Sequence, residues 1–486
     1  MKNRIKELFF QNKSSRQTVA KNIFWLSFSQ FGGRLIRSSL IIYAARLLGA
    51  SEYGLFSYVL GLSGFFMTFV DIGINPLLTR EVAKYPEKQY SYFSVSLFLK
   101  IILLISTSLL IFFVAPHFSK IEGAASLIPF IALLVIFDGV REFSIAFFRA
   151  KEKMELEALV SMFTNISITV FGFLILQRSA TAYDLTVTYI LSAGTGAIAA
   201  IILLRKEFHK VFSSFQKRLL KPLIADALPI ALVSVIGMFM LNVDIIMLGW
   251  LKTASDVGFY SSGQRIVQLL YTIPAILASS IFPALSRFVG EKNTEAVRAL
   301  VEQALTATFM ISLPLTIGGL VLARPIISFL YGVSYIPATL SFQILLGTLL
   351  LQFSWYFIGN LLFVYNKSLQ FSKYLILGSL SNIGFNLLLI PHFGAAGAAL
   401  ATVFSQILYI LLSWRMIKRD VYFLTLRYLP RIVFSSFLMG GFVFFLSILH
   451  LHVLLIIFIA ALFYFFLLYL QKEKALLHVF GLFKRV

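Results

Sequence analysis

Long apolar runs separated by short polar breaks dominate the chain. A helix needs roughly 20 consecutive, mostly apolar residues to cross the hydrocarbon core of a bilayer. Runs of that length recur along the whole chain and predict fourteen membrane-spanning helices. We expect these spans near residues 20–46, 53–78, 92–115, 124–148, 156–177, 183–204, 222–249, 257–286, 297–322, 337–364, 371–391, 395–417, 428–449 and 451–471.

One break in this pattern is irregular. Residues 324–338 read RPIISFLYGVSYIPA, and the apolar run inside this segment is too short to span a membrane. Pro325 and Pro337 lack the backbone N–H group that a helix interior uses, and Gly332 lies between them. The segment is predicted to form a re-entrant or interfacial turn outside the bilayer.

Composition places the chain among integral membrane proteins. Hydrophobic residues make up 59% of it and charged residues only 13%, with 51 Phe among 486 residues, far outside the range of soluble domains. The basic N-terminal segment lacks an apolar core followed by a small-residue cleavage site, so no removable signal peptide is expected. The chain contains no cysteine, which excludes disulfides, cysteine-ligated zinc and thiol catalysis.

The distribution of basic residues predicts the orientation in the membrane. With the N- and C-termini in the cytoplasm, 32 of the 42 Lys and Arg residues lie in or beside cytoplasmic segments, as the positive-inside rule requires. The external loops hold only Arg46, Lys120, Arg178, Lys252 and Arg324. The net charge of +21 is therefore a topogenic signal with some attraction to anionic membrane lipids, and nucleic acid is not an expected partner. A multi-pass protein of the cytoplasmic membrane is expected.

Two sequence motifs occur twice in the same order. ASEYGLF at residues 50–56 matches ASDVGFY at 254–260, and PLLTREV at 76–82 matches PALSRFV at 283–289. Both pairs occupy corresponding places on predicted helices 1 and 2 and on predicted helices 7 and 8. Ordered matches of this kind indicate an internal duplication. A weaker third pair joins MFTNISI at 162–168 to SLSNIGF at 379–385.

The duplication predicts the domain organisation. Six helices, an even number, separate the two copies, so both halves have the same orientation and are related by an axis along the membrane normal. We expect an all-α fold with two six-helix lobes around a central cavity that opens to one side at a time. The predicted parts are an N-terminal lobe (1–205), a basic cytoplasmic linker (206–221), a C-terminal lobe (222–419) and two further helices with a basic tail (420–486).

Arg34 and Arg37 are the most unusual cations inside the predicted spans. They lie one helical turn apart near the middle of the first span, where an arginine costs at least about 2.5 kcal/mol on insertion scales. One explanation is an ion pair with Asp71 or with an acid on residues 124–148, which would only hold helices together. The other is a cationic lining for an anionic substrate, with Arg141 and Arg265 as further candidates.

The acids inside the spans have two possible roles. Asp71, Asp138, Glu142 and Asp244 could be counter-ions for the arginines or could relay coupling ions, and the sequence does not separate these roles. Asp244 and Arg265 lie at similar depth and could pair. Lys100 is predicted to reach the cytoplasmic surface with its long side chain.

Small residues predict where helices pack closely. Gly32 and Gly33 immediately precede Arg34, and GAAGAALAT at residues 394–402 would allow close approach of two backbones. The scattered histidines, including His450 and His452, do not predict a metal site, and no Gly-Lys-Ser/Thr loop for nucleotides occurs. No bound cofactor is expected.

The first helix, the segment FVDIGINPLLTREV and the segment VDIIMLGWLKTASDVGFYSSGQRI resemble the polysaccharide transporter branch of the multidrug/oligosaccharidyl-lipid/polysaccharide (MOP) exporter superfamily. The resemblance extends over essentially the whole chain. It implies a flippase that moves a polyprenyl-pyrophosphate-linked oligosaccharide from the inner to the outer leaflet, coupled to a proton or sodium gradient. It also implies contacts with other polysaccharide assembly proteins.

Two alternatives stay open. A drug or metabolite cation antiporter of the same superfamily would need a mainly acidic cavity, whereas the predicted spans hold five cationic residues and four acids. A membrane glycan polymerase or ligase would need a large external loop, and the predicted external loops are short. A transporter without enzymatic activity is therefore the favoured class.

Overall fold

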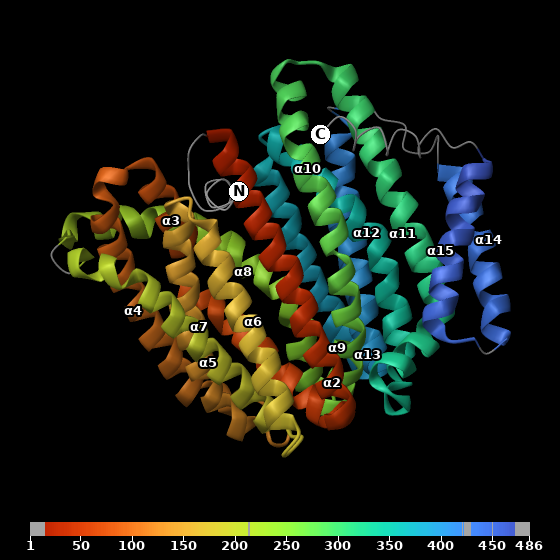
Figure 1. The fold of residues 1–486 in the computed structure, drawn as a ribbon, viewed down its shortest axis with the longest axis horizontal. Helices are drawn as coiled ribbons and strands as arrows, with labels where there is room; N and C mark the ends of the chain where they lie inside the picture. The colour runs from red at the N-terminus through yellow and green to blue at the C-terminus, as the bar shows by residue number, and fades with distance from the viewer. Residues whose placement is uncertain (1–14, 212–213, 420, 422–428, 450, 472–486) are drawn as a thin grey trace, which may run out of the picture. The chain divides into compact units, whose positions relative to one another are not determined.

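The computed structural model describes residues 15–211, 214–419, 421, 429–449 and 451–471. Within them every regular element is a helix (Figure 1). The α-helices are α2 (Ser15–Asp71), α3 (Ile74–Lys84), α4 (Gln89–Phe113), α5 (Ala124–Ala150), α6 (Met154–Leu176), α7 (Ala182–Val211), α8 (Leu220–Leu251), α9 (Ala254–Leu270), α10 (Thr272–Gly290), α11 (Thr294–Tyr331), α12 (Ala338–Val364), α13 (Ser368–Ile417), α14 (Leu429–Ile448) and α15 (Val453–Leu470). Short 3₁₀ turns are η1 (Pro86–Lys88), η2 (Ala115–Phe118), η4 (Lys217–Leu219) and η5 (Val333–Tyr335).

Two of these helices each contain two predicted spans. In the described part of the chain, twelve helical stretches are long and apolar enough to cross a membrane. The stretches in α2 and α13 are interrupted by Gly49 (φ 73°) and Gly394 (φ 53°), where two helices meet at a kink. Glycine adopts positive φ without a Cβ clash, so a single residue serves as the predicted external loop at each place. The twelve stretches therefore contain the fourteen predicted spans, and the predicted all-α membrane fold is confirmed.

The second predicted span ends earlier than its apolar run suggests. Helix α2 stops at Asp71, and Ile72 (φ 36°) and Gly73 (φ 76°) separate it from α3. Helix α3 is a short amphipathic helix, with Ile74 and Leu78 among its buried residues and charged side chains on its other face. The predicted span 53–78 therefore contains a break at residues 72 and 73.

The predicted turn at residues 324–338 is wrong in its first half. Helix α11 continues through Pro325 to Tyr331, and the chain turns only at Gly332 (φ 94°). Helices inside membrane proteins tolerate proline because neighbouring groups satisfy the freed carbonyls. The Ser328 hydroxyl donates to the Pro325 carbonyl at 3.1 Å, a bond within α11 that is separate from the Val321 carbonyl, which the missing proline N–H leaves without its usual donor. Tyr331 is buried and donates to the Ser262 carbonyl at 3.1 Å, so this segment is packed within the protein.

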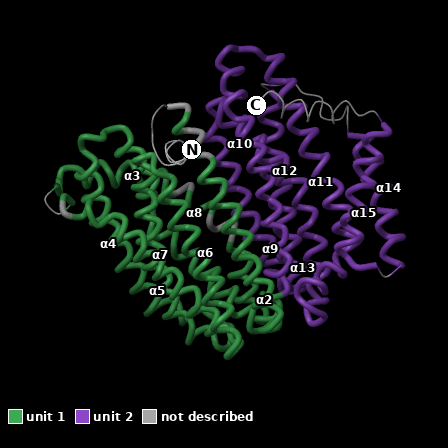
Figure 2. Tube along the Cα trace, in the orientation of Figure 1, with its two compact units in different colours: residues 1–258 green, residues 259–486 purple. Residues whose placement is uncertain are grey.

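The chain packs into two compact units, residues 1–258 and 259–486 (Figure 2). The core of the first unit includes Phe93, Phe143 and Phe147, from α4 and α5. In the second unit, residues of α11, α14 and α15 form another core, including Met439 and Tyr464. The packing places α8 in the first unit. The lobe limits inferred from the repeat rest on sequence alone and stay a prediction.

The repeated motifs contact each other within the first unit. A Cβ atom on Gly54 would clash with the carbonyl of Ala254, and a Cβ atom on Gly258 would clash with the carbonyl of Ala50. Each glycine of one copy thus lies against the alanine of the other copy. Small residues at this spacing let two helix backbones approach closely.

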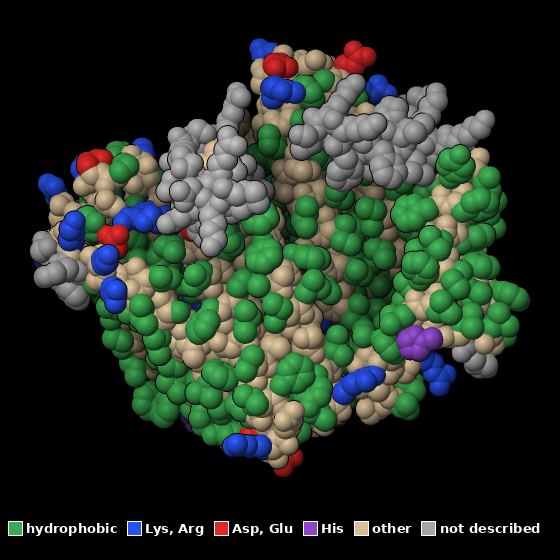
Figure 3. All heavy atoms as spheres, in the orientation of Figure 1, with side chains coloured by type: hydrophobic (Ala, Val, Ile, Leu, Met, Phe, Trp, Pro, Cys, Tyr) green, Lys and Arg blue, Asp and Glu red, His purple; other side chains and the backbone are tan. Residues whose placement is uncertain are grey.

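The lateral surfaces of the helices are apolar. Helix α4 exposes a row of large hydrophobic side chains, Phe98, Ile101, Ile105, Leu109 and Phe112. Figure 3 shows hydrophobic side chains over the flanks of the helices, with Lys and Arg gathered near α3 and the start of α4. Continuous apolar patches of this extent are rare on soluble monomers. The surface is that of a multi-pass membrane protein.

Candidate functional site

The two arginines of the first span lie on α2 beside α6. Arg34 is exposed and Arg37 is partly buried. A Cβ atom on Gly33 would stand 2.6 Å from Nδ2 of Asn165, and the Thr169 hydroxyl donates to the Ile36 carbonyl at 3.2 Å. The predicted close packing at this glycine is confirmed. Because Gly33 has no side chain, the α2 backbone next to Arg34 packs directly against α6.

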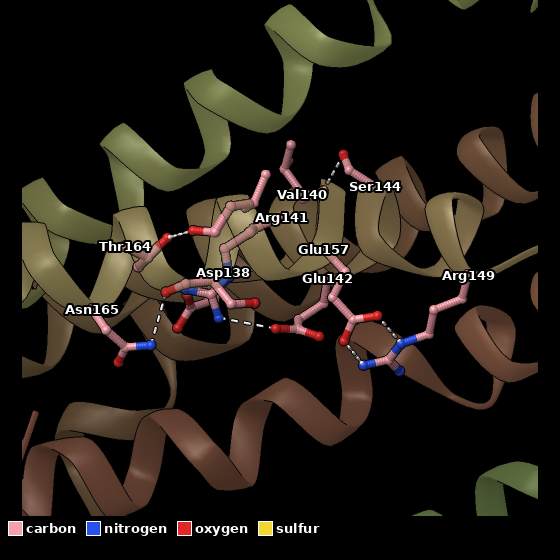
Figure 4. A network of polar contacts seen from close by, with 11 residues as sticks. Asp138, Val140, Arg141, Glu142, Ser144, Arg149, Glu157, Thr164 and Asn165 are labelled. Carbon is pink, nitrogen blue, oxygen red and sulfur yellow. Dashed lines mark hydrogen bonds and ion pairs between the residues drawn. The ribbon is translucent and has the colours of Figure 1, made fainter. Parts of the chain in front are cut away.

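Helix α5 carries three charged residues side by side (Figure 4). Arg141 forms an ion pair with Asp138 (Nη1–Oδ1, 2.8 Å) and donates to Glu142 (Nη2–Oε1, 3.0 Å). The aliphatic part of Arg141 is packed closely enough that a Cβ on Gly196 of α7 would lie 3.3 Å from its Cδ. Arg141 is therefore fixed between two acids of its own helix.

Arg37 faces this cluster. Its charge acts on Asp138, so the α2 arginine lies within electrostatic reach of an acid on α5. The alternative in which Arg37 serves as a counter-ion therefore has a candidate partner, Asp138, an acid on residues 124–148.

Lys100 does not reach the cytoplasmic surface, and the prediction that it would is wrong. Its side chain is 1% exposed, and its Nζ lies 3.8 Å from Oδ1 of Asp71. Position 100 belongs to the buried stripe of α4, together with Leu104, Thr107 and Ile111. These positions follow the helical repeat and face the interior of the unit. Glu142 also acts electrostatically on Lys100.

These contacts form one network in the first unit. Three cations (Arg37, Lys100, Arg141) and three acids (Asp71, Asp138, Glu142) come together from α2, α4 and α5. Charge balance makes such burial tolerable, because each charge has an opposite charge nearby. The structure thus shows that these six charges, which are spread over three helices, are neighbours.

Asp244 and Arg265 lie in different compact units. Asp244, on α8, is 2% exposed, and Arg265 lies on α9 beyond residue 258. The pair that the sequence suggests stays a prediction.

A buried amide cluster in the second unit escaped the sequence analysis. Asn386 donates to Oδ1 of Asn382 at 3.1 Å, and Asn382 donates to the Ser405 hydroxyl at 3.5 Å. Thr402 and Tyr260 share a further hydrogen bond of 3.3 Å between their hydroxyls. The available signal was the four-residue spacing of the two asparagines in an apolar span. Among the residues that the structure describes, no group of three or more His, Asp and Glu side chains is arranged to hold a metal ion.

Comparison with known families identifies the chain. The family model described as polysaccharide biosynthesis protein matches residues 19–289, more than half of the sequence. The chain belongs to the polysaccharide biosynthesis protein family. A second model, MatE, matches residues 229–391 of this family member. The predicted place in the polysaccharide branch of the MOP superfamily is confirmed.

This member of the polysaccharide biosynthesis protein family has a relative in Haloferax volcanii named "Probable low-salt glycan biosynthesis flippase Agl15". The two are 24% identical over 81% of this chain and 80% of the relative. The fold resembles the solved structure "Lipid II flippase MurJ, inward closed conformation", with a TM-score of 0.75, 17% identity and coverage of 93% of this chain and 100% of that one. The fold also resembles an inward-facing multidrug resistance MATE family transporter of the MOP superfamily, with a TM-score of 0.67, 15% identity and coverage of 82% of this chain and 98% of that one.

The region matched by the polysaccharide biosynthesis protein family contains every predicted site residue. The six charges of the first-unit network, Arg34, Asp244 and Arg265 all fall between residues 19 and 289. Their roles are taken up below as proposals.

Proposed function

We propose that this protein is a flippase that moves a polyprenyl-pyrophosphate-linked oligosaccharide from the inner to the outer leaflet of the cytoplasmic membrane. Membership of the polysaccharide biosynthesis protein family supports this class of transport, and the relative from Haloferax volcanii carries a flippase name. The likeness to the two solved transporters concerns the fold alone.

The observation that carries the proposal is the pair of arginines on α2. A pyrophosphate group loses its hydration when it crosses a bilayer, and that loss is prohibitive in hydrocarbon without compensating charge. Arg34 is exposed at the middle of the predicted span 20–46, with Arg37 one turn away. Guanidinium groups offer planar donor pairs that match phosphate oxygens. We assign Arg34 and Arg37 to the pyrophosphate, with Arg141 and Arg265 as secondary contacts, while the lipid tail stays in the bilayer.

An ion gradient would drive the cycle. Asp71, Asp138, Glu142 and Asp244 are the candidates for binding a proton or a sodium ion in exchange for substrate, because carboxylates inside membranes commonly have this role. Alternating access of two lobes would then carry the headgroup across. The positive-inside distribution of Lys and Arg supports cytoplasmic N- and C-termini for this proposal.

Reconstitution tests the proposal. Purified protein is placed in liposomes that contain a fluorescent polyprenyl-pyrophosphate oligosaccharide, and a glycosidase added outside reports which molecules are accessible. We expect the protein to raise the accessible fraction above that of protein-free liposomes, and an imposed proton or sodium gradient to accelerate the rise. Unchanged accessibility with correctly folded protein would refute the flippase.

The MatE match over residues 229–391 favours one rival, a cation antiporter. The same liposomes test it. Uptake of a fluorescent organic cation against an ion gradient, without movement of the oligosaccharide, would replace the proposed function by cation export. A change in the length of the oligosaccharide would instead indicate a polymerase or ligase.

A further inference from the structure

Lys100 is held by charge without a hydrogen bond. Its Nζ is buried and has no hydrogen-bond partner among the described residues, although Asp71 lies 3.8 Å away and Glu142 acts on it electrostatically. A buried ammonium without hydrogen bonds costs free energy, because its three N–H donors have lost their hydrogen bonds to water. Such a group can move between two acids more readily than one fixed by directional bonds.

Asp71 lies at a strained junction. It is the last residue of α2, and its Oδ1 accepts the backbone N–H of Asn75, in the first turn of α3, at 3.0 Å. Between them Ile72 adopts φ 36° and Gly73 adopts φ 76°. A β-branched residue in the left-handed region is a true outlier and persists only where its surroundings impose it. The Asp71 carboxylate is one of the groups that impose it, because it bridges the end of α2 to the start of α3.

The junction is in direct contact with α8. A Cβ on Gly73 would stand 2.8 Å from the Ala227 carbonyl oxygen and 2.9 Å from Cβ of Ile230. Pro229 lies between these two contacts and interrupts the backbone hydrogen bonding of α8. A rotation at residues 72 and 73 would therefore press against α8 on both sides of its proline.

The two acids near Lys100 are held differently. Glu142 accepts a hydrogen bond from Arg141 at 3.0 Å. Within the described part of the chain, Asp71 accepts a backbone N–H and has the ammonium at 3.8 Å; its side chain is 26% exposed and that of Glu142 is 37% exposed. Water can reach both carboxylates, and Asp71 is the one that accepts no hydrogen bond from a cation.

Other charged groups on the helices around Lys100 have partners or lie elsewhere. On α5, Arg141 and Asp138 pair with each other. Arg80 of α3 pairs with Glu81 and with Asp226 of α8. The charges of α7 lie at its two ends, Asp184 on one side and Arg205, Lys206, Glu207 and Lys210 on the other. Arg149 of α5 pairs with Glu157 of α6. The further charges of the neighbouring elements are Arg16, Lys21, Arg34, Arg37, Arg46 and Glu52 on α2, Lys84, Glu87 and Lys88 near the start of α4, Lys217, Arg218, Lys221 and Asp244 in η4 and α8, and His117 in η2.

We propose that Lys100 is a positioning residue that couples proton uptake to movement of the α2–α3 junction. When Asp71 binds one proton, its carboxylate becomes a neutral carboxylic acid, and the Lys100 ammonium keeps its own protons and turns to Glu142. The neutral acid caps Asn75 more weakly, since hydrogen bonds to charged acceptors are the stronger ones. The junction at Ile72 and Gly73 then relaxes and displaces α8 near Pro229. This inference rests on the proposed function for its role in transport, but the movement itself can be measured separately.

Two spin labels measure the movement. The chain has no cysteine, so cysteines introduced at Ala83 on α3 and Leu159 on α6, both exposed, are the only attachment points. Double electron–electron resonance then gives the distance distribution between them at mildly alkaline and mildly acidic pH. We expect acid to shift the distribution of the parent protein and Asp71→Asn to show the acid distribution at both pH values. Lys100→Gln, in which Asp71 keeps its carboxylate but loses the ammonium, should change the pH dependence of the shift.

Matched variants sharpen the test. Lys100→Arg keeps the charge and should retain the pH-dependent shift, and so should Lys88→Gln, which neutralises an exposed lysine in η1. Glu142→Gln removes the alternative partner and should move the transition to lower pH. If Lys100→Gln does not insert, Asp71→Asn carries the same test. Three results would overturn the inference: a distribution that does not change with pH in the parent, a shift that persists in Asp71→Asn, or a pH dependence in Lys100→Gln identical to that of the parent.

Transport separates the two proposals. In the oligosaccharide liposomes, Lys100→Gln should lose the acceleration by a proton gradient, while Lys100→Arg and Lys88→Gln keep it. If the parent moves substrate under a proton gradient and Lys100→Gln responds equally, the inference fails and the flippase stands. If the parent moves no substrate yet its distance distribution titrates as described, the proposed function fails and the junction mechanism stands.

Discussion

Gly258 lies directly against Ala50, so closely that no side chain could be added to the glycine without striking the alanine carbonyl. The mirror relationship holds for Gly54 and Ala254. All four residues come from the duplicated Ala-Ser-acidic-x-Gly motif, at the predicted external ends of the helices. Packing therefore explains why the two copies share the motif, because the glycine of each copy packs against the alanine of the other.

Adding bulk at this crossing should separate the helices. Gly258→Val and Gly54→Val each place methyl groups where a backbone carbonyl stands, and overpacking of this kind typically costs about 1 to 3 kcal/mol. We expect a lower midpoint of thermal unfolding in detergent. Gly290→Ala is the control, since nothing lies within 4 Å of its Cβ position. Equal midpoints for Gly258→Val and the control would show that the crossing does not contribute to stability.

Neutralising the α2 arginines should stop export without removing the protein. A hydrogen bond to a charged group is worth about 1.5 to 3 kcal/mol, which corresponds to roughly a 10- to 100-fold loss in transport rate. Arg34→Ala or Arg37→Ala should therefore abolish surface polysaccharide in cells while immunoblots show normal abundance in the membrane. Arg205→Ala, an exposed arginine at the end of α7, should behave like the parent. Normal export with neutral side chains at both positions 34 and 37 would refute the assignment.

Arg141 should behave differently from Arg34. Its removal leaves Asp138 and Glu142 without their shared cation, and breaking a buried pair in this way costs about 3 kcal/mol or more. We expect Arg141→Met to lower both the thermal midpoint and the amount of protein in the membrane. The triple variant Asp138→Asn, Arg141→Met, Glu142→Gln removes all three charges and should recover part of the stability. No recovery would mean that Arg141 stabilises the unit through its packing.

A double-mutant cycle tests the pairing of Asp244 with Arg265. If the two interact, Asp244→Asn and Arg265→Gln each lower the transport rate. The double variant should then transport no more slowly than the less active of the two single variants, because the effects of paired residues are non-additive. The exchange Asp244→Arg with Arg265→Asp should restore part of the rate. Additive losses in the liposome assay would show that the two residues act independently.

Most of the fold could be predicted because the membrane simplifies the problem. Span length, glycine breaks and the positive-inside rule each have one physical cause, so the fourteen spans were visible in the sequence. Pro325 misled the prediction, because proline often ends helices in water, whereas α11 continues through Pro325 to Tyr331. The break at Ile72 was also hidden, since an isoleucine at φ 36° follows from tertiary contacts that no local pattern records.

Most residues of the candidate site could be predicted from the sequence, but the contacts between them could not. Arg37, Asp71, Asp138, Arg141 and Glu142 stood out as charges in apolar runs. That Lys100 faces inward follows from the stripe it shares with Leu104, and the helical repeat contained this information. That Arg37 lies within electrostatic reach of Asp138 depends on how α2 crosses α5, which the sequence of either helix does not fix. The amides Asn382 and Asn386 were missed because only ionisable residues were considered.

The reciprocal contact between the two motifs also bears on how the chain arose. Two identical subunits in parallel orientation, related by a two-fold axis, meet through an isologous interface in which residue i of one touches residue j of the other and the reverse. Ala50 with Gly258 and Ala254 with Gly54 have this form within a single polypeptide. An ancestor of half the length, acting as a homodimer, would have used the same alanine and glycine twice. In such an origin, fusion of two gene copies would leave the contact restricting divergence at these four positions, while the rest of each half would be free to specialise.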